Sequence, residues 1–144
     1  MSDTALLLDS VFERHDPGPG HPEAVARYTE ISKVVKGSDV YKKCKSVKIR
    51  EATDSEILGC HTAEYLDVVK TEIAEGKSEL STGDTCICKD SLEVARYATG
   101  SVLESIDLVF DGQAKNAFCA IRPPGHHATA DRGMGFCIFN HVAV

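Results

Sequence analysis

One short apolar run, followed by a loop of restricted geometry, constrains this sequence more than any other feature. Residues 117–121 read Ala-Phe-Cys-Ala-Ile without interruption, a pattern typical of a buried strand in a parallel sheet. The run leads directly into Arg-Pro-Pro-Gly-His-His-Ala at 122–128, where two prolines and a glycine restrict the backbone. Ligands of open α/β sheets bind beyond the carboxyl ends of the strands. We therefore expect His126 and His127 to face one cleft.

Helix and strand patterns alternate along the rest of the chain. Helical spacing, N-capping residues and glycine stops predict helices at 22–37, 53–59, 62–76 and 90–111, with Thr53 or Asp54, Thr62 and the pair Asp90 and Glu93 at their starts. Strands are expected at 4–12, 46–50 and 117–121, and loops at 15–23 and 76–90. A further apolar segment begins at Gly135 and reaches Val144 within an expected helix start. Strands separated by helices predict an α/β fold with a parallel sheet.

Length and charge exclude several classes of protein. The 144 residues, 42% of them hydrophobic, suit one domain, since domains usually have about 100–150 residues. No apolar run approaches the roughly 20 residues that span a bilayer, and the N-terminus lacks the pattern of a signal peptide. We expect a cytoplasmic or nuclear protein that contacts no membrane. The net charge of −6 argues against direct binding to nucleic acid.

The six cysteines have neither zinc-ribbon spacing nor the secreted context of a disulfide framework. We expect reduced thiols, with Cys119 and Cys137 buried among apolar neighbours. Cys86 and Cys88 could place two thiols on one face of an extended segment, so metal or redox chemistry stays open there. A hydrolase built from Cys119 or Cys137 with His127 fits poorly if both thiols are buried.

Basic residues concentrate between Lys33 and Arg50. An acidic partner could dock on this segment. A solvated helix end with the loop after it is the simpler interpretation, because only Tyr41 is available nearby for base stacking.

The histidine pair has two possible kinds of chemistry. An imidazole ordinarily titrates near neutral pH, and a neighbouring carboxylate can make one ring differ from the other, so His126 and His127 suit proton transfer. Metal ligation is the rival role, and a pair of surface or structural histidines is the alternative without function. The other histidines are expected on loops or helix surfaces rather than as ligands: His15, His21, His61 and His141.

Longer motifs point to a family. Arg122-Pro-Pro-Gly-His-His-Ala128, Met134-Gly-Phe-Cys-Ile-Phe-Asn140 and His141-Val-Ala-Val144 resemble the zinc-dependent histone deacetylase family, in particular its class II and bacterial or polyamine-deacetylase-like branches. Earlier segments agree with this resemblance: His15-Asp-Pro, Gly20-His-Pro-Glu23 with Arg27, Cys60-His-Thr-Ala-Glu-Tyr65 and Gly83-Asp-Thr85. One departure is Ala24-Val25, where many members have Arg-Pro. The resemblance covers nearly the whole chain, although only residues 122–140 are diagnostic by themselves.

The resemblance implies the arginase/deacetylase fold, a parallel sheet flanked by helices, with residues 1–144 as only its N-terminal portion. It also implies hydrolysis of an acetylated amine, in which zinc polarises the amide carbonyl and activates water. The implied substrates are acetyl-lysine in histones or other proteins and acetylpolyamines. Corepressor-type protein partners are a further implication.

Roles carry over from the family motif by residue. His127 would be the principal general base and then acid, and His126 would give electrostatic help and proton balance. Gly135 and Phe136 would line the narrow tunnel that holds the acyl-lysine stem, although Phe136 could instead be a core aromatic. His21 and Arg27 would lie near the pocket as elements of the first loop.

The family's zinc ligands have no match in this sequence. They come from an Asp-x-His element within a His-His-Gly-Asn-Gly context and from a later Asp, and the transition-state Tyr follows later still. Since a catalytic zinc normally needs three protein ligands, we expect the proton-transfer half of the site without its metal half, and no activity from this chain alone. Two hypotheses follow. The chain is the N-terminal part of a deacetylase domain, truncated before the metal-binding elements, or it is a non-catalytic interaction or regulatory module. The expected helix start near Val144 favours the first hypothesis.

Overall fold

A parallel three-stranded sheet with β1 in the middle organises the fold. The structure is a computed structural model that describes residues 3–144. Its strands are β1 (Thr4–Leu8), β2 (Lys45–Ser46) and β3 (Asn116–Ala120), in the order β2-β1-β3. β1 pairs with β3 along its whole length, from Thr4 opposite Asn116 to Leu8 opposite Ala120. The predicted α/β class with a parallel sheet is confirmed.

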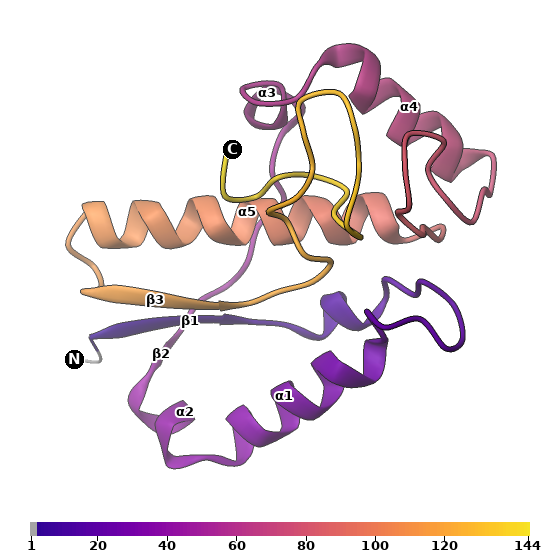
Figure 1. Ribbon diagram of the computed structural model, residues 1–144. Coiled ribbons are helices and arrows are strands. Elements are labelled where there is room, and N and C mark those ends of the chain that lie inside the picture. Colours follow the sequence, from indigo (N-terminus) through magenta and orange to yellow (C-terminus); the bar gives the residue numbers. More distant parts are fainter. Residues whose placement is uncertain (1–2) are drawn as a thin grey trace.

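Helices cover the two faces of this sheet (Figure 1). The helices are α1 (Val25–Gly37), α2 (Asp39–Lys43), α3 (Asp54–Ile57), α4 (Ala63–Ala74) and α5 (Ser91–Phe110), and a 3-10 helix η1 (Ser10–Glu13) follows β1. In Figure 1, α1 and α2 lie on one side of the sheet and α5 on the other, with α3 and α4 beyond α5. Within residues 3–144, no helix is long and apolar enough to cross a membrane.

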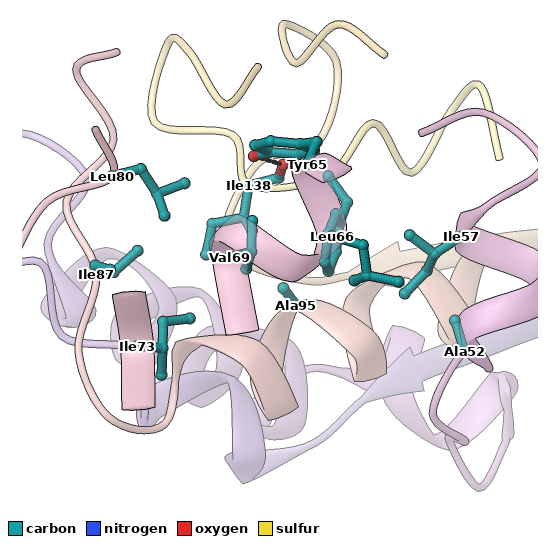
Figure 2. Packing of buried hydrophobic residues seen from close by; sticks show 11 residues of the cluster. Ala52, Ile57, Tyr65, Leu66, Val69, Ile73, Leu80, Ile87, Ala95 and Ile138 are labelled. Atoms are coloured by element: carbon teal, nitrogen blue, oxygen red, sulfur yellow. Dashed lines mark hydrogen bonds between the residues drawn. The ribbon is translucent and has the colours of Figure 1, made fainter. Parts of the chain in front are cut away.

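α5 is buried on two sides because it lies between two apolar clusters. Toward the sheet, Val94 and Ala98 pack with Leu7 of β1. Toward α4, Ala95 packs with Val69 and its neighbours, as Figure 2 shows. Full burial of a Val or Leu side chain contributes about 1.5–3 kcal/mol. These two clusters therefore hold α5 between the sheet on one side and α4 on the other.

Two of the predicted helix starts are confirmed in detail. Thr53 Oγ1 accepts a hydrogen bond from the Glu56 amide at 3.2 Å, and the Glu56 carboxylate accepts one from the Thr53 amide at 2.7 Å, which makes a capping box. Thr62 caps α4 by accepting from the Tyr65 amide. The predicted capping box at α5 is wrong. The carboxylates of Asp90 and Glu93 bind the Arg14 guanidinium instead of the helix amides.

Several predicted boundaries are wrong for local reasons. β1 stops at Leu8 because the Asp9 carboxylate accepts from the Val11 amide and starts η1. The strand expected at 46–50 is confined to Lys45–Ser46. After a last bond from the Val47 amide to the Leu6 carbonyl, the chain leaves β1 and bonds to α5 through the Ala52 amide. The first helix begins at Val25 rather than Pro22, α2 was not expected, and residues 141–143 form a turn rather than a helix start.

β3 is less buried than its apolar sequence predicts. Phe118 is 54% exposed, whereas Ala120 is buried. The strand lies at the edge of the sheet, and Phe118 faces an apolar groove of about 380 Å³ that Val34 and Val40 also line. The run is therefore a parallel strand, as predicted, but only one of its faces is covered within residues 3–144.

The lysines of the basic segment 33–50 are exposed. Arg50, at its end, forms ion pairs with Glu56 at 2.9 Å and Glu104 at 3.5 Å. These features agree with a solvated surface. They do not test the alternative of an acidic partner.

Candidate functional site

A buried arginine fixes the start of the loop that follows β3. The residue Arg122 is 3% exposed, and its side chain donates to both carboxylate oxygens of Glu23, at 2.9 and 2.7 Å. It also donates to the main-chain carbonyls of Phe12, at 2.8 Å, and of His15. Bidentate pairs of this kind fix orientation as well as adding energy. Arg122 thus holds the loop at residues 122–128, which carries the histidine pair, against the first loop of the chain at residues 15–23.

His15 lies in a loop, as predicted, but it is buried inside this network. The ring is 1% exposed; Nδ1 is 2.8 Å from Ser91 Oγ, and Nε2 is 3.6 Å from the Glu23 carboxylate. Burial, and then the nearby positive charge of Arg122, lower the pKa of His15 to about 4. His15 is therefore neutral at physiological pH, and its contact with Glu23 is not an ion pair.

His126 and His127 lie side by side in the loop after the carboxyl end of β3, where the sequence places them, and both residues are exposed. That they face one cleft stays a prediction. Their ring centroids are 4.2 Å apart. The buried Cys137 thiol fixes the backbone at both histidines, because its Sγ accepts from the amides of His126 and His127 at 3.5 Å each. Within residues 3–144, neither ring forms an ion pair or hydrogen bond with a carboxylate.

The loop that ends at Cys137 brings the predicted tunnel residues next to His127. Gly135 and Phe136 both have positive φ angles, of 58° and 66°, in a tight turn closed by hydrogen bonds between Met134 and Cys137. A positive φ at a bulky residue costs about 1–3 kcal/mol and persists only where the surroundings enforce it. A Cβ on Gly135 would lie 2.8 Å from the His127 ring. Gly135 therefore lets the turn approach that ring.

Phe136 is partly exposed and contacts the first loop rather than the core. Its ring packs edge-to-face on His21, with centroids 4.6 Å apart. His21 Nδ1 accepts from the Glu23 amide, so this contact is tied to the Arg122 network. Five of the six predicted site residues are thus contiguous. The exception is Arg27, which is exposed in the first turn of α1 and forms no side-chain hydrogen bond or ion pair within residues 3–144.

Asp84, which the sequence did not single out as a site residue, supports this turn from the loop before α5. Its carboxylate accepts from the Gly135 amide at 2.8 Å. We expect Asp84→Ala to speed hydrogen exchange of the Gly135 amide about tenfold, since a charged acceptor contributes more than an average hydrogen bond. Asp84→Asn keeps an acceptor oxygen and should restore part of the protection. The matched control is Asp131→Ala, because Asp131 is exposed and binds only Thr129 nearby. Equal exchange in all variants would contradict the assignment.

His61 and His141 also lie outside helices and strands, as predicted, and they too are buried. His61 is 4% exposed and accepts from the Asn140 amide through Nε2 at 3.0 Å. Burial lowers its pKa. His141 is 2% exposed and lies under the loop at 122–125. The partners of both rings are distant in sequence, and no local pattern marks them.

The residues present do not form a zinc site. Within residues 3–144, no three His, Cys, Asp or Glu side chains converge where they could hold a metal ion. His126 and His127 alone fall short of the three protein ligands of a catalytic zinc.

Two cysteines, Cys119 and Cys86, lack the lowered thiol pKa that is typical of a catalytic nucleophile. Burial raises the pKa of Cys119 and of Cys86, which disfavours the reactive thiolate. Cys137 is buried, as predicted, whereas Cys119 is only half-buried.

Comparison with known proteins decides the family. The family described as "Histone deacetylase domain" matches residues 21–144. This chain belongs to the histone deacetylase family. It is 41% identical over 134 residues to Histone deacetylase 6 of Caenorhabditis elegans, a match that covers 86% of this chain and 14% of that protein. It is 31% identical over 153 residues to Polyamine deacetylase HDAC10 of Danio rerio, covering 99% of this chain and 22% of that protein.

A solved structure confirms the fold of this deacetylase-family chain. The crystal structure of the HDA15 HD domain superimposes with a TM-score of 0.90 at 32% sequence identity, over 99% of this chain and 42% of that one. The chain therefore spans less than half of the structure and of the relatives to which it is compared, and corresponds to the N-terminal part of the domain. The expected deacetylase fold is confirmed, as is membership in this family of hydrolases.

Proposed function

We propose that this chain supplies the proton-transfer histidines of a zinc-dependent deacetylase domain. One arrangement carries the proposal: the exposed pair His126 and His127 lies next to the turn at Gly135 and Phe136. The Phe136 ring in turn packs on the His21 ring. Proton-transferring rings and a partly apolar wall are the two features that hydrolysis of an acylated alkyl amine requires.

In the proposed reaction, His127 accepts a proton from water as the water oxygen bonds to the acyl carbon. The same ring then returns the proton to the amine nitrogen as the carbon–nitrogen bond breaks, which releases the free amine and acetic acid, and the acid then loses its proton to solvent. His126, whose ring centroid is 4.2 Å away, assists electrostatically. The zinc that the family resemblance implies would need protein ligands of its own, which the proposal places outside residues 1–144.

Substrate class follows from the wall of the site. Phe136 presents a partly exposed ring against which the methylenes of a thin alkyl stem can pack. An acetyl-lysine of a histone or another protein has such a stem, as does an acetylpolyamine. The names of the two relatives, a histone deacetylase and a polyamine deacetylase, support both. A cytoplasmic or nuclear location and corepressor-type partners belong to the same proposal.

One observation favours a second candidate, a non-catalytic interaction or regulatory module. Phe118, Val34 and Val40 are 54–67% exposed around one apolar groove, and exposed apolar patches often mark interaction surfaces.

Zinc content and turnover distinguish the two candidates. We expect residues 1–144 alone to bind no stoichiometric zinc and to leave an acetyl-lysine reporter intact. The coding sequence beyond Val144 should encode an Asp-x-His element, and the longer chain should deacetylate the reporter. In that chain His127→Ala should lower kcat about 10²- to 10⁴-fold, while Thr129→Ala, an exposed change in the same loop, should not. A stop codon directly after Val144, or a longer chain that is indifferent to His127→Ala, would contradict the deacetylase proposal.

A further inference from the structure

His141 lies directly beneath the loop that carries the histidine pair. Its ring is fully enclosed, with Nε2 3.2 Å from the Pro123 carbonyl oxygen and Nδ1 2.8 Å from Thr99 Oγ1 on α5. A Cβ on Gly125 would lie 2.0 Å from His141 Cδ2. The ring therefore packs on the Gly125 main chain at a distance that only glycine permits. It joins the loop after β3 to the central helix.

The hydrogen-bond partners determine which ring nitrogen carries the proton. A carbonyl oxygen only accepts, so Nε2 must be protonated and donate to Pro123. Among residues 3–144, no carboxylate lies within hydrogen-bond distance of the enclosed ring, and burial lowers the pKa of His141 to about 4. In the resulting neutral ring Nδ1 has no proton. The Thr99 hydroxyl lies 2.8 Å from Nδ1 and 3.0 Å from the Ala95 carbonyl oxygen, and its single proton can go to only one of these acceptors at a time. An unprotonated Nδ1 requires that this proton go to the ring.

The residues on either side of His141 hold the same loop. The Asn140 side-chain amide donates to the Ala128 carbonyl at 2.9 Å, and the Val142 amide donates to the Gly125 carbonyl at 3.3 Å. Together with the hydrogen bond from His141 to the Pro123 carbonyl, these bonds fix the main chain before and after residues 126–127. His141 is the member of this group that connects the loop to α5.

We propose that His141 is a positioning residue, a neutral Nε2–H imidazole oriented by Thr99 that fixes the Pro123–Gly125 backbone and thereby the placement of His126 and His127. The assignment to catalysis rests on the proposed function. The positioning itself does not, and it can be measured on residues 1–144 without turnover.

Nitrogen-15 NMR of the labelled chain tests the state of the ring. We expect His141 to show a protonated Nε2 and an unprotonated Nδ1 throughout roughly pH 5–8, a range in which an unperturbed histidine titrates. The Nε2 proton should exchange slowly with water. A doubly protonated His141 at pH 7, or the opposite tautomer, would overturn the proposal.

Substitution of Thr99 tests the positioning. Thr99→Val removes the hydroxyl with little change of shape, and we expect it to shift the amide resonances of residues 123–128 and to speed exchange of the His141 Nε2 proton about tenfold or more. Thr99→Ser should restore both signals. Thr29→Val is the matched control, because the Thr29 hydroxyl also lies near the carbonyl four residues earlier in a helix, 3.3 Å from the Val25 oxygen, but forms no hydrogen bond with a histidine. Unchanged loop resonances in a folded Thr99→Val chain would contradict the proposal. If that variant does not fold, the ring state in the wild type and Thr99→Ser still decides.

Activity adds a separate measurement. In the longer chain, Thr99→Val should lower kcat about 10- to 100-fold with little change in KM, since misplacement of a catalytic group by about 1 Å can cost that much. Inactivity of the unsubstituted longer chain would reject the proposed function and leave the NMR result on His141 standing.

Discussion

Arg122→Ala is expected to lower the free energy of unfolding by about 3–5 kcal/mol, the range for removing one partner of a buried ion pair. The substitution leaves the Glu23 carboxylate, whose residue is 6% exposed, without its bidentate partner. It also removes the donor that serves the main-chain carbonyls of Phe12 and His15. An isolated buried charge is costlier than the lost attraction alone.

Urea denaturation of residues 1–144 measures this loss. Arg14→Ala is the matched control, since Arg14 also binds two carboxylates, those of Asp90 and Glu93, but on the surface. We expect it to cost less than about 1 kcal/mol. Arg122→Lys should fall between the two, because an ammonium cannot reproduce the planar fork. Equal losses for Arg122→Ala and Arg14→Ala would mean that burial adds nothing to this network.

Mild acid is expected to destabilise the chain through its buried histidines. Burial lowers the pKa values of His15 and His141 to about 4 from 6.5. Between these values the unfolded chain binds more protons than the folded chain, so stability falls as the pH falls. The contribution is complete above pH 6.5 and is lost progressively down to about pH 4. At about 1.4 kcal/mol per pKa unit, each histidine accounts for about 3 kcal/mol.

Urea midpoints at intervals from pH 8 to pH 5 test this expectation. Stability should be nearly constant from pH 8 to pH 7 and should fall between pH 6.5 and pH 5. The carboxyls of Asp54 and Glu56 cannot cause that fall, because hydrogen bonds from Lys70 and Arg50 lower their folded pKa values, that of Glu56 to about 2. Their contribution is lost at lower pH. His15→Asn should reduce the slope with pH, whatever its effect on stability at pH 8. A flat profile down to pH 5 would show that neither ring is buried in its neutral form.

Local sequence patterns predict the site as far as its chemistry is local. The run at 117–121 and the prolines after it place His126 and His127 at the carboxyl end of a strand, and that placement is confirmed. Capping at Thr53 and Thr62 follows from bonds within one helical turn and is likewise confirmed.

The remaining features depend on contacts between distant residues. Arg122 and Glu23 are 99 residues apart in sequence, and Thr99 and His141 are 42 apart. His15, His61 and His141 lie outside helices and strands, as predicted, but their local sequence gives no sign that distant segments will bury them. Asp90 illustrates the same limit, because Arg14, 76 residues away, draws its carboxylate from the helix cap.

The direction of these long-range bonds bears on synthesis of the chain. Every residue that the Arg122 side chain binds, namely Phe12, His15 and Glu23, precedes it in sequence, as do both partners of the His141 ring. Translation on the ribosome proceeds from the N-terminus at about 5–20 residues per second. The partners of Arg122 are therefore already synthesised when Arg122 emerges, whereas the bonds that Cys137, Asn140 and His141 make to the histidine loop form only after those later residues have emerged.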